Sequence, residues 1–297
     1  MRVTDSMLFN QTAYNVDQAQ SRLQALNSQA STGVVVTHPW DNPGQAGLAV
    51  TYQVTGARFG AIAQAVSSAS QELNTAAASL TTVNDALTQA LGVAMQMGSD
   101  AYTPAQRTAA ATEVVGIQNS IVGALNAQVA NRYVFGGTID NAAPFSATGA
   151  YSGNASVRQV EVAPGVYQDA SVRADVAIKG VGGGVDVFAA LGALSTALSA
   201  NNAPGVIAAQ AGLRTAMEQV QTAQAQAGTN SVALNTAQQV SQAVQADQNT
   251  GLSNAVNGDE VTLATQLAQA QTAYQAAITA SQKTFQLSFI NAVPSGG

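Results

Sequence analysis

The sequence predicts a mainly α protein: a long antiparallel helical bundle or coiled coil whose N- and C-terminal helices pair, with a small β-rich insert in mid-chain. Apolar residues recur at steps of three and four from residue 9 to 128 and again from 188 to 288, which is the helical period. Between these segments, short runs of period two are separated by Gly, Pro, Asn and Asp, as in strands. Only 9% of the residues are charged, so the helices need partners to cover their outer faces.

The last helix is predicted over residues 261–289. Its larger or apolar side chains follow mostly the spacing of a coiled-coil seam, with Ile278 widening the stripe: Leu263, Leu267, Ala270, Tyr274, Ala277, Ser281, Phe285 and Ser288. No charged residue stands between Val261 and Gln282. A helix with a narrow seam and an uncharged back needs partners on more than one side.

The first thirty residues carry a similar helical stripe, formed by Phe9, Ala13, Val16, Gln20, Leu23, Leu26 and Ala30. Both ends of the chain are therefore helices with incomplete cores. We predict a terminal coiled-coil domain of residues 1–42 with 255–297. Its expected assembly interface consists of Phe9, Val16, Leu23, Leu26, Leu263, Leu267, Tyr274, Ile278 and Phe285.

An ordered connector is expected at residues 33–41. Gly33 can take the left-handed conformation that ends a helix. Asn42 reads as the N-cap of the next helix, with Pro43 at its first position and Gln45 as the capping-box partner. The connector residues singled out are Ser31, Thr32, Gly33, Asp41 and Pro43.

A helical rod domain is predicted from residues 43–135 with 204–254. Its first helix runs about 50 residues to Gly98, on a stripe of Phe59, Ile62, Val66, Ala69, Leu73, Ala76, Leu80, Val83, Leu87, Ala90 and Ala94. A capping box at Thr103 starts the second, expected to end near Asn131, with the seam Ala110, Val114, Ile117, Ile121, Ala124 and Gln128. The short link between the two makes them antiparallel neighbours.

The returning helix of the rod follows Pro204. Its stripe is Val206, Leu213, Met217 and Val220, then Ala233, Ala237, Val240 and Val244. Gly228 ordinarily marks a break, yet the register is nearly kept across it, so the periodicity leaves open whether this helix is continuous. Asn257-Gly258-Asp259 marks a firmer joint before the last helix.

Residues 136–203 are predicted to form the β-rich outer insert. Strands are expected over residues 157–162 and 172–178, separated by a turn at Ala163-Pro164-Gly165, and helix resumes near Phe188. Two pairs of opposite charges, Arg158 with Glu161 and Arg173 with Asp175, are interpreted as solvated strand faces.

Composition and motifs argue against catalysis. The chain has no Cys, which excludes disulfides and thiol chemistry, and a formal charge of −6 does not favour nucleic acid. No secretory h-region or membrane-spanning run is seen. His38 stands in a loop with only Asp41 near it in sequence, and Gly180–Gly184 fails the dinucleotide pattern. Asp169 and Asp175 are interpreted as scattered strand acids. We expect no enzyme, cofactor or metal site.

Several motifs together resemble the bacterial flagellar hook–filament junction proteins, the third type of hook-associated protein in the flagellin superfamily. They lie at both ends and in the middle of the chain: Met1-Arg2-Val3-Thr4 with Met7, Gln29–Gly33 followed by Pro39–Pro43, Asn131–Thr138, Arg158–Gly165 and Phe285–Phe289. The connector departs from the family pattern, which has a basic residue where Val34 stands and Ser-Asp-Asp where Trp40-Asp41-Asn42 stands.

The resemblance implies a structural subunit of the flagellum. Such a subunit is secreted unfolded through the flagellar type III export system, without a cleaved signal, into the extracellular flagellum. It self-assembles as a ring between hook and filament, with its terminal helices forming the inner tube. Its expected partners are the neighbouring hook-associated junction protein on the hook side, flagellin on the filament side and an export chaperone. The resemblance also implies that Gly228 lies inside one continuous helix.

Two alternative functions remain. A flagellin-type filament subunit usually has a different N-terminal run and a short Leu-rich C-terminal tail, and lacks the motifs at Asn131–Thr138 and Ala163–Gly165. A secreted coiled-coil effector or adhesin would not explain apolar seams divided between the two ends of the chain.

Overall fold

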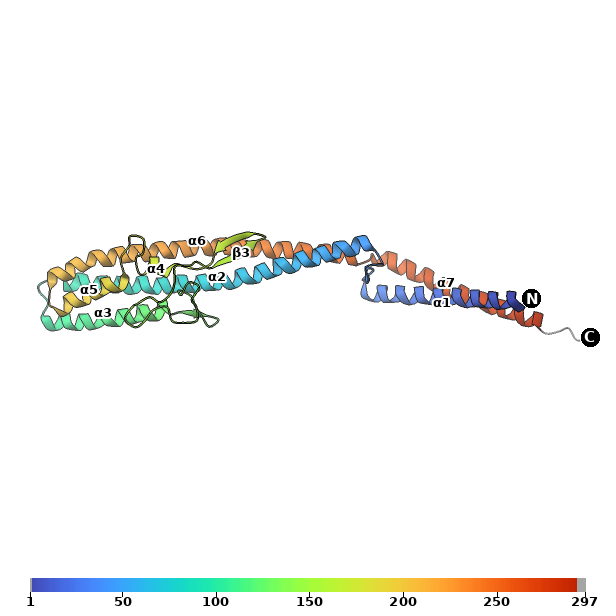
Figure 1. The fold of residues 1–297 in the computed structure, drawn as a ribbon, viewed down its shortest axis with the longest axis horizontal. Helices are drawn as coiled ribbons and strands as arrows, with labels where there is room; N and C mark the ends of the chain where they lie inside the picture. Colours follow the sequence, from blue (N-terminus) through green and yellow to red (C-terminus); the bar gives the residue numbers. More distant parts are fainter. Residues whose placement is uncertain (1, 293–297) are drawn as a thin grey trace, which may run out of the picture. The chain divides into compact units, whose positions relative to one another are not determined.

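The computed structural model describes the backbone of residues 2–292 and the side chains of residues 7–286. Seven helices and two short hairpins follow one another in this part of the chain (Figure 1). The chain divides into two compact units, which we call the terminal unit (Met1–Gly56 with Ala246–Gly297) and the core unit (Ala57–Gln245). The mainly α fold with a small β-rich insert is confirmed.

Two long helices, α2 (Pro43–Met97) and α6 (Ala203–Val256), supply the core unit with their residues 57–97 and 203–245. Along α2, side chains that are almost completely buried follow at intervals of seven residues: Val66, Leu73, Leu80, Leu87 and Ala94. A second series begins at Ile62 and runs through Val83 to Met97 with the same interval. Two apolar positions in every seven residues is the repeat of a coiled coil, so the stripe predicted for this helix is confirmed from Ile62 on.

Side-chain hydrogen bonds between α2 and α6 fix the register of this antiparallel pair. Four uncharged pairs flank the seam: Ser70 with Asn235, Asn74 with Ser231, Thr81 with Gln224, and Asn84 with Gln221. Each step forward along α2 is matched by an equal step back along α6, so the register does not slip. Amide and hydroxyl side chains here do the work that charged pairs do in many coiled coils.

The helix α6 is continuous through Gly228, as the family resemblance implied. Its buried positions also recur every seven residues: Val206, Leu213, Val220, Ala227, Leu234 and Ser241. The stripe predicted beyond Gly228 is wrong at Val240, which is exposed while the adjacent Ser241 is buried. Its other members, Ala233, Ala237 and Val244, are half-buried. The prediction followed the larger apolar residue, whereas the heptad repeat continues unchanged across the glycine and places a serine in the seam.

Helices α3 (Pro104–Leu125) and α5 (Val187–Ser199) complete the core unit. The predicted capping box of α3 is confirmed, with Thr103 Oγ1 accepting from Gln106 N. The charged residue Arg107 of α3 is buried, and its guanidinium donates to Met97 O, Ser99 O and Asn201 Oδ1. Two of these acceptors are orphan carbonyls at or just beyond the end of α2, where a cation is electrostatically favoured.

The end of α3 lies at Leu125, earlier than the predicted end near Asn131. The side chain of Asn126 instead bonds the backbone of Phe145 in both directions, through Oδ1 and Nδ2. Positive φ angles at Ala130 and Asn131 then make a tight turn between β1 (Gln128–Val129) and β2 (Arg132–Tyr133). These local side-chain bonds compete with continued helix.

The insert contains one hairpin, β3 (Gln159–Ala163) with β4 (Val166–Asp169), around the predicted turn at residues 163–165. The strand predicted over residues 172–178 is wrong, because this segment contains the short helix α4 (Ala174–Ala177). The consecutive residues Ala174 and Asp175 are both buried, which a half-buried strand does not allow.

Ion pairs join the insert to α2, so the interpretation of its charges as solvated strand faces is wrong. Arg158 is mostly buried and lies 2.7 Å from Glu72 of α2, while Glu161 pairs with Arg58 at 2.9 Å. Arg173 pairs with Asp175 at 2.6 Å. The period-two pattern could not reveal partners that lie so far away in the sequence.

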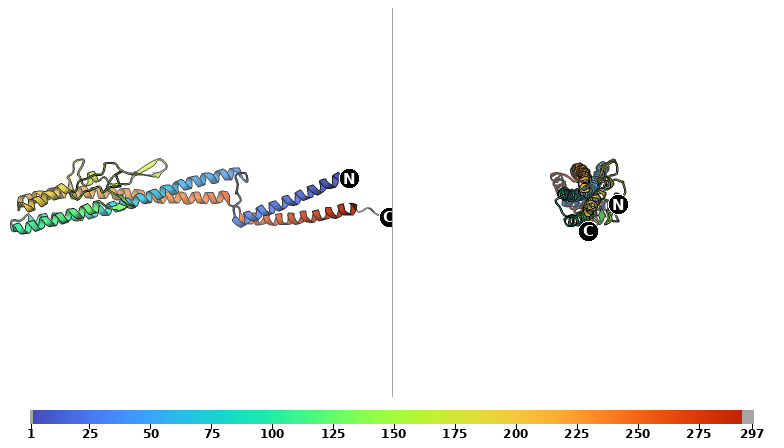
Figure 2. Two further views of the ribbon diagram at one scale, coloured as in Figure 1. Left: turned by 60° about the horizontal axis from the view of Figure 1, so that its bottom comes forward. Right: turned by 90° about the vertical axis from the view of Figure 1, so that its left-hand side faces the viewer.

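The insert and the helices also share one hydrophobic core. Phe145, Val172 and Ile178 belong to the same buried cluster as the seam residues of α2 and α6. Figure 2 shows the loops and hairpin of the insert lying along these helices. The insert is therefore held to the core unit by apolar packing as well as by ion pairs.

Ser241 is the place where this seam can be improved. Its side chain is fully buried and its Oγ has no hydrogen-bond partner, which leaves a desolvated hydroxyl in the core. We expect Ser241→Ala to stabilise the chain by about 1 kcal/mol and to raise the melting temperature by about 2–4 °C.

The matched control is Ser231→Ala, on the exposed flank of the same helix, which removes the bond to Asn74 Oδ1 and should leave stability unchanged or slightly lower. Thermal melts followed by circular dichroism measure both variants. A lower melting temperature for Ser241→Ala would show that its hydroxyl stabilises the seam.

Candidate assembly interface

The helices α1 (Arg2–Thr32) and α7 (Glu260–Ala292) of the terminal unit pack against each other; we call them the terminal pair. They run antiparallel. At one end Gly258 N donates to Gly33 O at 3.0 Å, and towards the other the rings of Phe9 and Phe285 meet edge to face at 5.2 Å. The predicted pairing of the two ends of the chain is confirmed.

The terminal pair closes a single narrow seam. Leu26, Leu263 and Ala270 are its only buried apolar side chains among residues 7–32 and 260–286. The rest of the seam is half-buried: Thr12, Val16, Ala19 and Leu23 of α1, and Leu267, Tyr274, Ala277, Ile278, Ser281 and Thr284 of α7. The predicted stripe of α1 is wrong at Ala13, Gln20 and Ala30, which are exposed. Thr12 and Ala19 lie in the seam instead, because they stand four and three residues from Val16 on the same face of the helix.

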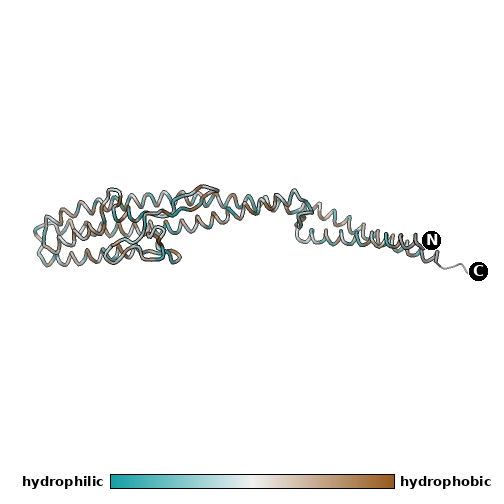
Figure 3. The backbone as a smooth tube through the Cα atoms, viewed as in Figure 1, coloured by the Kyte–Doolittle hydropathy of each residue, from teal (hydrophilic) through white to brown (hydrophobic). Residues whose placement is uncertain are grey.

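Large apolar side chains remain in solvent on the terminal pair. The exposed fraction is 66% for Met7, 55% for Leu8 and 73% for Val261, and Phe9, Tyr14 and Phe285 are also exposed. In Figure 3 apolar and polar residues are interspersed along both helices. The seam therefore uses only part of the apolar surface that these helices carry.

The connector between α1 and α2 is an ordered loop held by Asp41. Its Oδ2 accepts hydrogen bonds from Thr37 Oγ1 at 2.8 Å, His38 N at 2.8 Å and Thr37 N at 3.0 Å. The Thr37 hydroxyl and the backbone N–H of His38 hold the pKa of the Asp41 carboxyl below its usual value. Each bond favours the charged carboxylate, so the loop is most ordered when Asp41 is ionised.

The other connector residues lie at the two helix ends. Gly33 has φ of 73° and ends α1, and Thr32 Oγ1 accepts from Val34 N at 3.3 Å. Asn42 Oδ1 accepts from Gln45 N at 3.2 Å and caps α2, with Pro43 as its first residue. Ser31 is exposed.

Backbone bonds join this connector to the end of α6, in an arrangement that we call the joint (residues 33–36 with 256–258). Val35 N and Val36 N both donate to Val256 O, at 2.8 and 3.2 Å, and Val34 forms an isolated β-bridge with Asn257. The joint thus ties the start of the connector to the segment that separates α6 from α7.

The same loop presents Trp40, the single tryptophan, to solvent. Its indole stacks on the His38 ring, with centroids 4.6 Å apart and planes at 14°, and the residue is 74% exposed. His38 thus has a packing role within the loop. An exposed indole on an ordered loop is a frequent anchor of protein interfaces. Trp40 was not singled out as an interface residue from the sequence, where it stood only as a departure from the family pattern.

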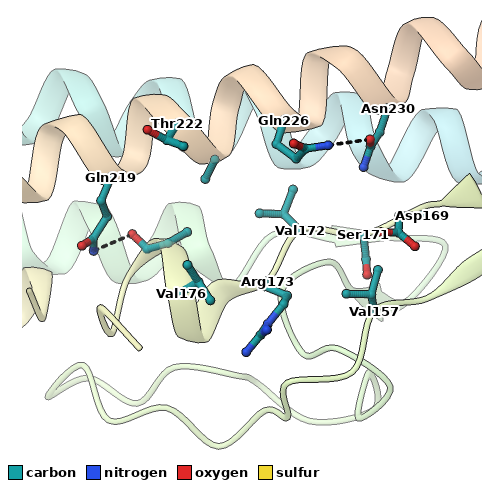
Figure 4. Close-up of a pocket in the computed structure, with 12 residues that line it drawn as sticks. Val157, Asp169, Ser171, Val172, Arg173, Val176, Gln219, Thr222, Gln226 and Asn230 are labelled. Carbon is teal, nitrogen blue, oxygen red and sulfur yellow. Dashed lines mark hydrogen bonds between the residues drawn. The ribbon is translucent and has the colours of Figure 1, made fainter. Parts of the chain in front are cut away.

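A second candidate site is a cavity of about 420 Å³ between the insert and α6 (Figure 4). Val172 and Val176 line its apolar side. Its amides are already engaged within the chain: Gln219 Nε2 donates to Ala177 O at 2.9 Å, and Gln226 Nε2 donates to Asn230 Oδ1 at 2.9 Å. Asp169 at its rim accepts from Gln159. These contacts fasten the insert to α6 and assemble no nucleophile, base or oxyanion donor.

Neither a metal site nor a membrane-spanning helix is found where the structure is described. Among those residues, no group of three or more His, Cys, Asp or Glu side chains is placed to hold a metal ion. No helix there combines the length and the apolar character needed to cross a bilayer. The terminal pair and the connector remain the candidate site.

Comparisons with known proteins agree with one another. Residues 3–140 match the model of the bacterial flagellin N-terminal helical region. The chain is 28% identical over 308 residues to flagellar hook-associated protein 3 of Salmonella typhimurium, covering 96% of each chain. Over nearly its whole length the chain is thus similar to a flagellar hook-associated protein 3, and its N-terminal part matches the flagellin N-terminal helical region.

Solved structures of flagellar hook-associated proteins share the fold. A flagellar hook-associated protein from Vibrio parahaemolyticus aligns at 21% identity with a TM-score of 0.65, covering 73% of this chain and all of that one. FlgL from Bacillus cereus aligns at 18% identity with a TM-score of 0.57, covering 70% of this chain and 99% of that one. This likeness confirms the mainly α architecture of the family.

The lowered pKa of Asp41 gives a test of the connector. Because the folded pKa lies below the usual value, the loop is stabilised above that value, and the stabilisation is lost as the pH falls through the folded pKa. We expect Trp40 fluorescence to change with a midpoint below pH 3.8, the ordinary value for Asp, while far-ultraviolet circular dichroism shows whether the helices persist.

The control is Asp41→Asn, which cannot ionise and should lack this acidic transition. If wild type and Asp41→Asn gave the same titration below pH 3.8, the carboxylate would not order the loop.

Proposed function

We propose that the chain assembles into the junction layer through the open faces of its terminal pair, supported by the connector. One observation carries this proposal: the terminal pair buries only one seam, whereas the core unit has a complete apolar core. Outside this core, the terminal unit has just five buried apolar side chains among its described residues: Leu26, Ala49, Ala255, Leu263 and Ala270.

The energetics favour assembly over isolation. Most of the stability of a helix in a protein comes from packing of its apolar face, and isolated helices are marginal in water. Burying an exposed Leu or Met side chain is worth about 1.5–3 kcal/mol. Met7, Leu8 and Val261 are available for such burial in every subunit. Repeated around a ring, these gains stabilise an assembly more than any single chain.

In this proposal each segment has its place in the assembly. Residues 1–42 with 255–297 form an inner tube, and Phe9, Val16, Leu23, Leu26, Leu263, Leu267, Tyr274, Ile278 and Phe285 belong to its packing. Residues 43–135 with 204–254 form the helical rod domain, and residues 136–203 form the β-rich outer insert. Ser31, Thr32, Gly33, Asp41 and Pro43 set the course of the chain between the first two.

The partners follow from the same position. Copies of this chain lie side by side in a ring, a neighbouring hook-associated junction protein lies on the hook side, and flagellin lies on the filament side. The subunit reaches the extracellular flagellum unfolded, through type III export with the help of a chaperone. Its role is structural rather than catalytic, and it needs no cofactor.

The alternative, a filament subunit, shares the terminal helices and differs in behaviour. A filament subunit polymerises by itself into long filaments, whereas a junction subunit forms one layer. Complementation of a strain that lacks the native junction protein tests the proposal. Cells carrying the wild-type chain should swim, and cells without it should carry hooks and release filament subunits into the medium. Long filaments made from the purified chain alone would favour the filament subunit.

Leu8→Asp tests the open face of α1. Leu8 is 55% exposed in the chain, so the carboxylate should stay in water and leave the melting temperature within about 2 °C. In an assembled tube it would bury an unpaired charge, at a cost of several kcal/mol per subunit. We expect secretion to continue and motility to be lost.

The matched control is Val115→Asp, which places the same charge at an exposed apolar position of the core unit and should leave motility intact. Motility of Leu8→Asp equal to that of Val115→Asp would remove α1 from the interface.

Trp40→Ala tests the connector separately. The indole contacts only the exposed His38 ring in the described contacts, so its loss should barely change the melting temperature. If Trp40 packs against a neighbouring subunit, truncation should cost about 2 kcal/mol or more per contact and reduce the fraction of cells with filaments. Electron microscopy of cells expressing each variant gives that fraction.

The control is Trp40→Phe, which keeps an aromatic ring and should retain more filaments than Trp40→Ala. Equal counts for the wild type and both variants would exclude an anchoring role.

A further inference from the structure

We propose that Asn257, which precedes Gly258, is a site of spontaneous deamidation and that the joint slows this reaction. Asn257-Gly258 is the single Asn-Gly dipeptide in the chain. Glycine has no Cβ to hinder approach of its own nitrogen, and its backbone reaches conformations closed to other residues. These properties make an Asn before Gly the most reactive amide of its kind in a flexible chain.

The reaction needs no partner other than water. The backbone nitrogen of Gly258 loses its proton and attacks Cγ of Asn257, a C–N bond forms, and ammonia leaves with the side-chain nitrogen. The five-membered succinimide is then opened by water at either of its two carbonyls. Attack at one carbonyl leaves an ordinary aspartate at position 257, and attack at the other leaves an isoaspartate whose main chain passes through the side-chain carbon.

The structure holds both reacting groups in an unproductive arrangement. The Gly258 N–H, which must become the nucleophile, donates to Gly33 O at 3.0 Å. The side-chain amide of Asn257, which must lose its nitrogen, donates to Ser253 Oγ at 2.7 Å, and the Asn257 N–H donates to Ser253 O at 2.9 Å. Cyclisation requires two bonds to break: the one from Gly258 N to Gly33 O and the one from the Asn257 side-chain amide to Ser253 Oγ.

Packing adds to this protection at Gly258. A Cβ added there would overlap Val35 and come within 3.0 Å of Leu263 Cδ1, so the glycine backbone is enclosed between these two side chains. Asn257 itself is exposed, and water is therefore at hand as soon as the joint opens. Reaction at Asn257 should proceed only through molecules in which residues 33–36 have separated from residues 256–258.

The rate of deamidation then reports the fraction of molecules in which the joint is open. When opening and closing are fast compared with a slow chemical step, the observed rate follows the equilibrium population of the open form. Val35, Gly33 and Leu263 lie where α1 ends and α7 begins, so this population reports on the docking of the terminal pair. A chain in which the terminal pair is undocked should therefore be deamidated at Asn257.

The two products differ in their effect. An aspartate at 257 would stand between the C-terminus of α6, which disfavours negative charge, and the N-terminus of α7, which favours it, and it leaves the length of the main chain unchanged. An isoaspartate lengthens the main chain between Val256 and Gly258. The bonds from Val35 N to Val256 O and from Gly258 N to Gly33 O could then no longer form together, and the joint would not reclose.

Peptide mapping by mass spectrometry tests the proposal on the purified full-length chain in mildly alkaline buffer. A synthetic peptide of residues 252–262 gives the unprotected rate. We expect conversion of Asn257 in the folded chain to be slower than in the peptide by a factor on the order of ten or more. Leu263→Asp, which places a charge beside Gly258, should restore a rate close to that of the peptide.

Val261→Asp is the matched control, because it adds the same charge two residues away at a position that is 73% exposed. It should keep the slow rate of the wild-type chain. Equal rates in the folded chain and the peptide would overturn the proposal, as would a Leu263→Asp rate no faster than that of Val261→Asp. A peptide that stays intact at Asn257 would overturn it as well.

Discussion

Two helices packed only against each other can bury one stripe each, and this limit sets the character of the terminal pair. Leu26, Leu263 and Ala270 close the part of its seam nearest the joint, while Met7, Leu8 and Val261 remain in water. Between Val261 and Gln282 the sequence of α7 has no charged residue. Its outer face therefore lacks the charges that are typical of a helix face in solvent. A surface of this kind is stable when further helices cover it.

The core unit shows what the same residue types achieve with enough helices. The heptad positions of α2 and α6 are filled from both sides, α3 and α5 close the bundle, and the insert adds Phe145 and Ile178 to the same core. Uncharged side chains such as Asn84 and Gln221 hold the register. The low charge content of the chain thus has two consequences. In the core unit amides and hydroxyls bond within the molecule, and in the terminal pair the outer face carries few charges.

The long helices could be predicted because their periodicity is local and repeats many times, from Ile62 to Met97 above all. The insert could not, since its structure depends on distant partners: Glu72 for Arg158, and the Phe145 backbone for Asn126. In the terminal pair the predicted stripe agrees with the burial along α7 and at most positions of α1, while the interface itself stays a prediction. The sequence did not single out Trp40, because a solitary exposed aromatic residue has no pattern, or Ser241, because a serine in a seam breaks the rule by which seams are found.

The central claim is that the terminal pair is completed by neighbouring subunits. Amide hydrogen exchange, read by mass spectrometry on the monomer and on flagella containing the chain, tests it most directly. If neighbouring subunits complete the terminal pair, amides of α1 and α7 should exchange far faster than those of α2 and α6 in the monomer and become strongly protected in flagella. Equal protection of all four helices in the monomer, unchanged on assembly, would contradict it.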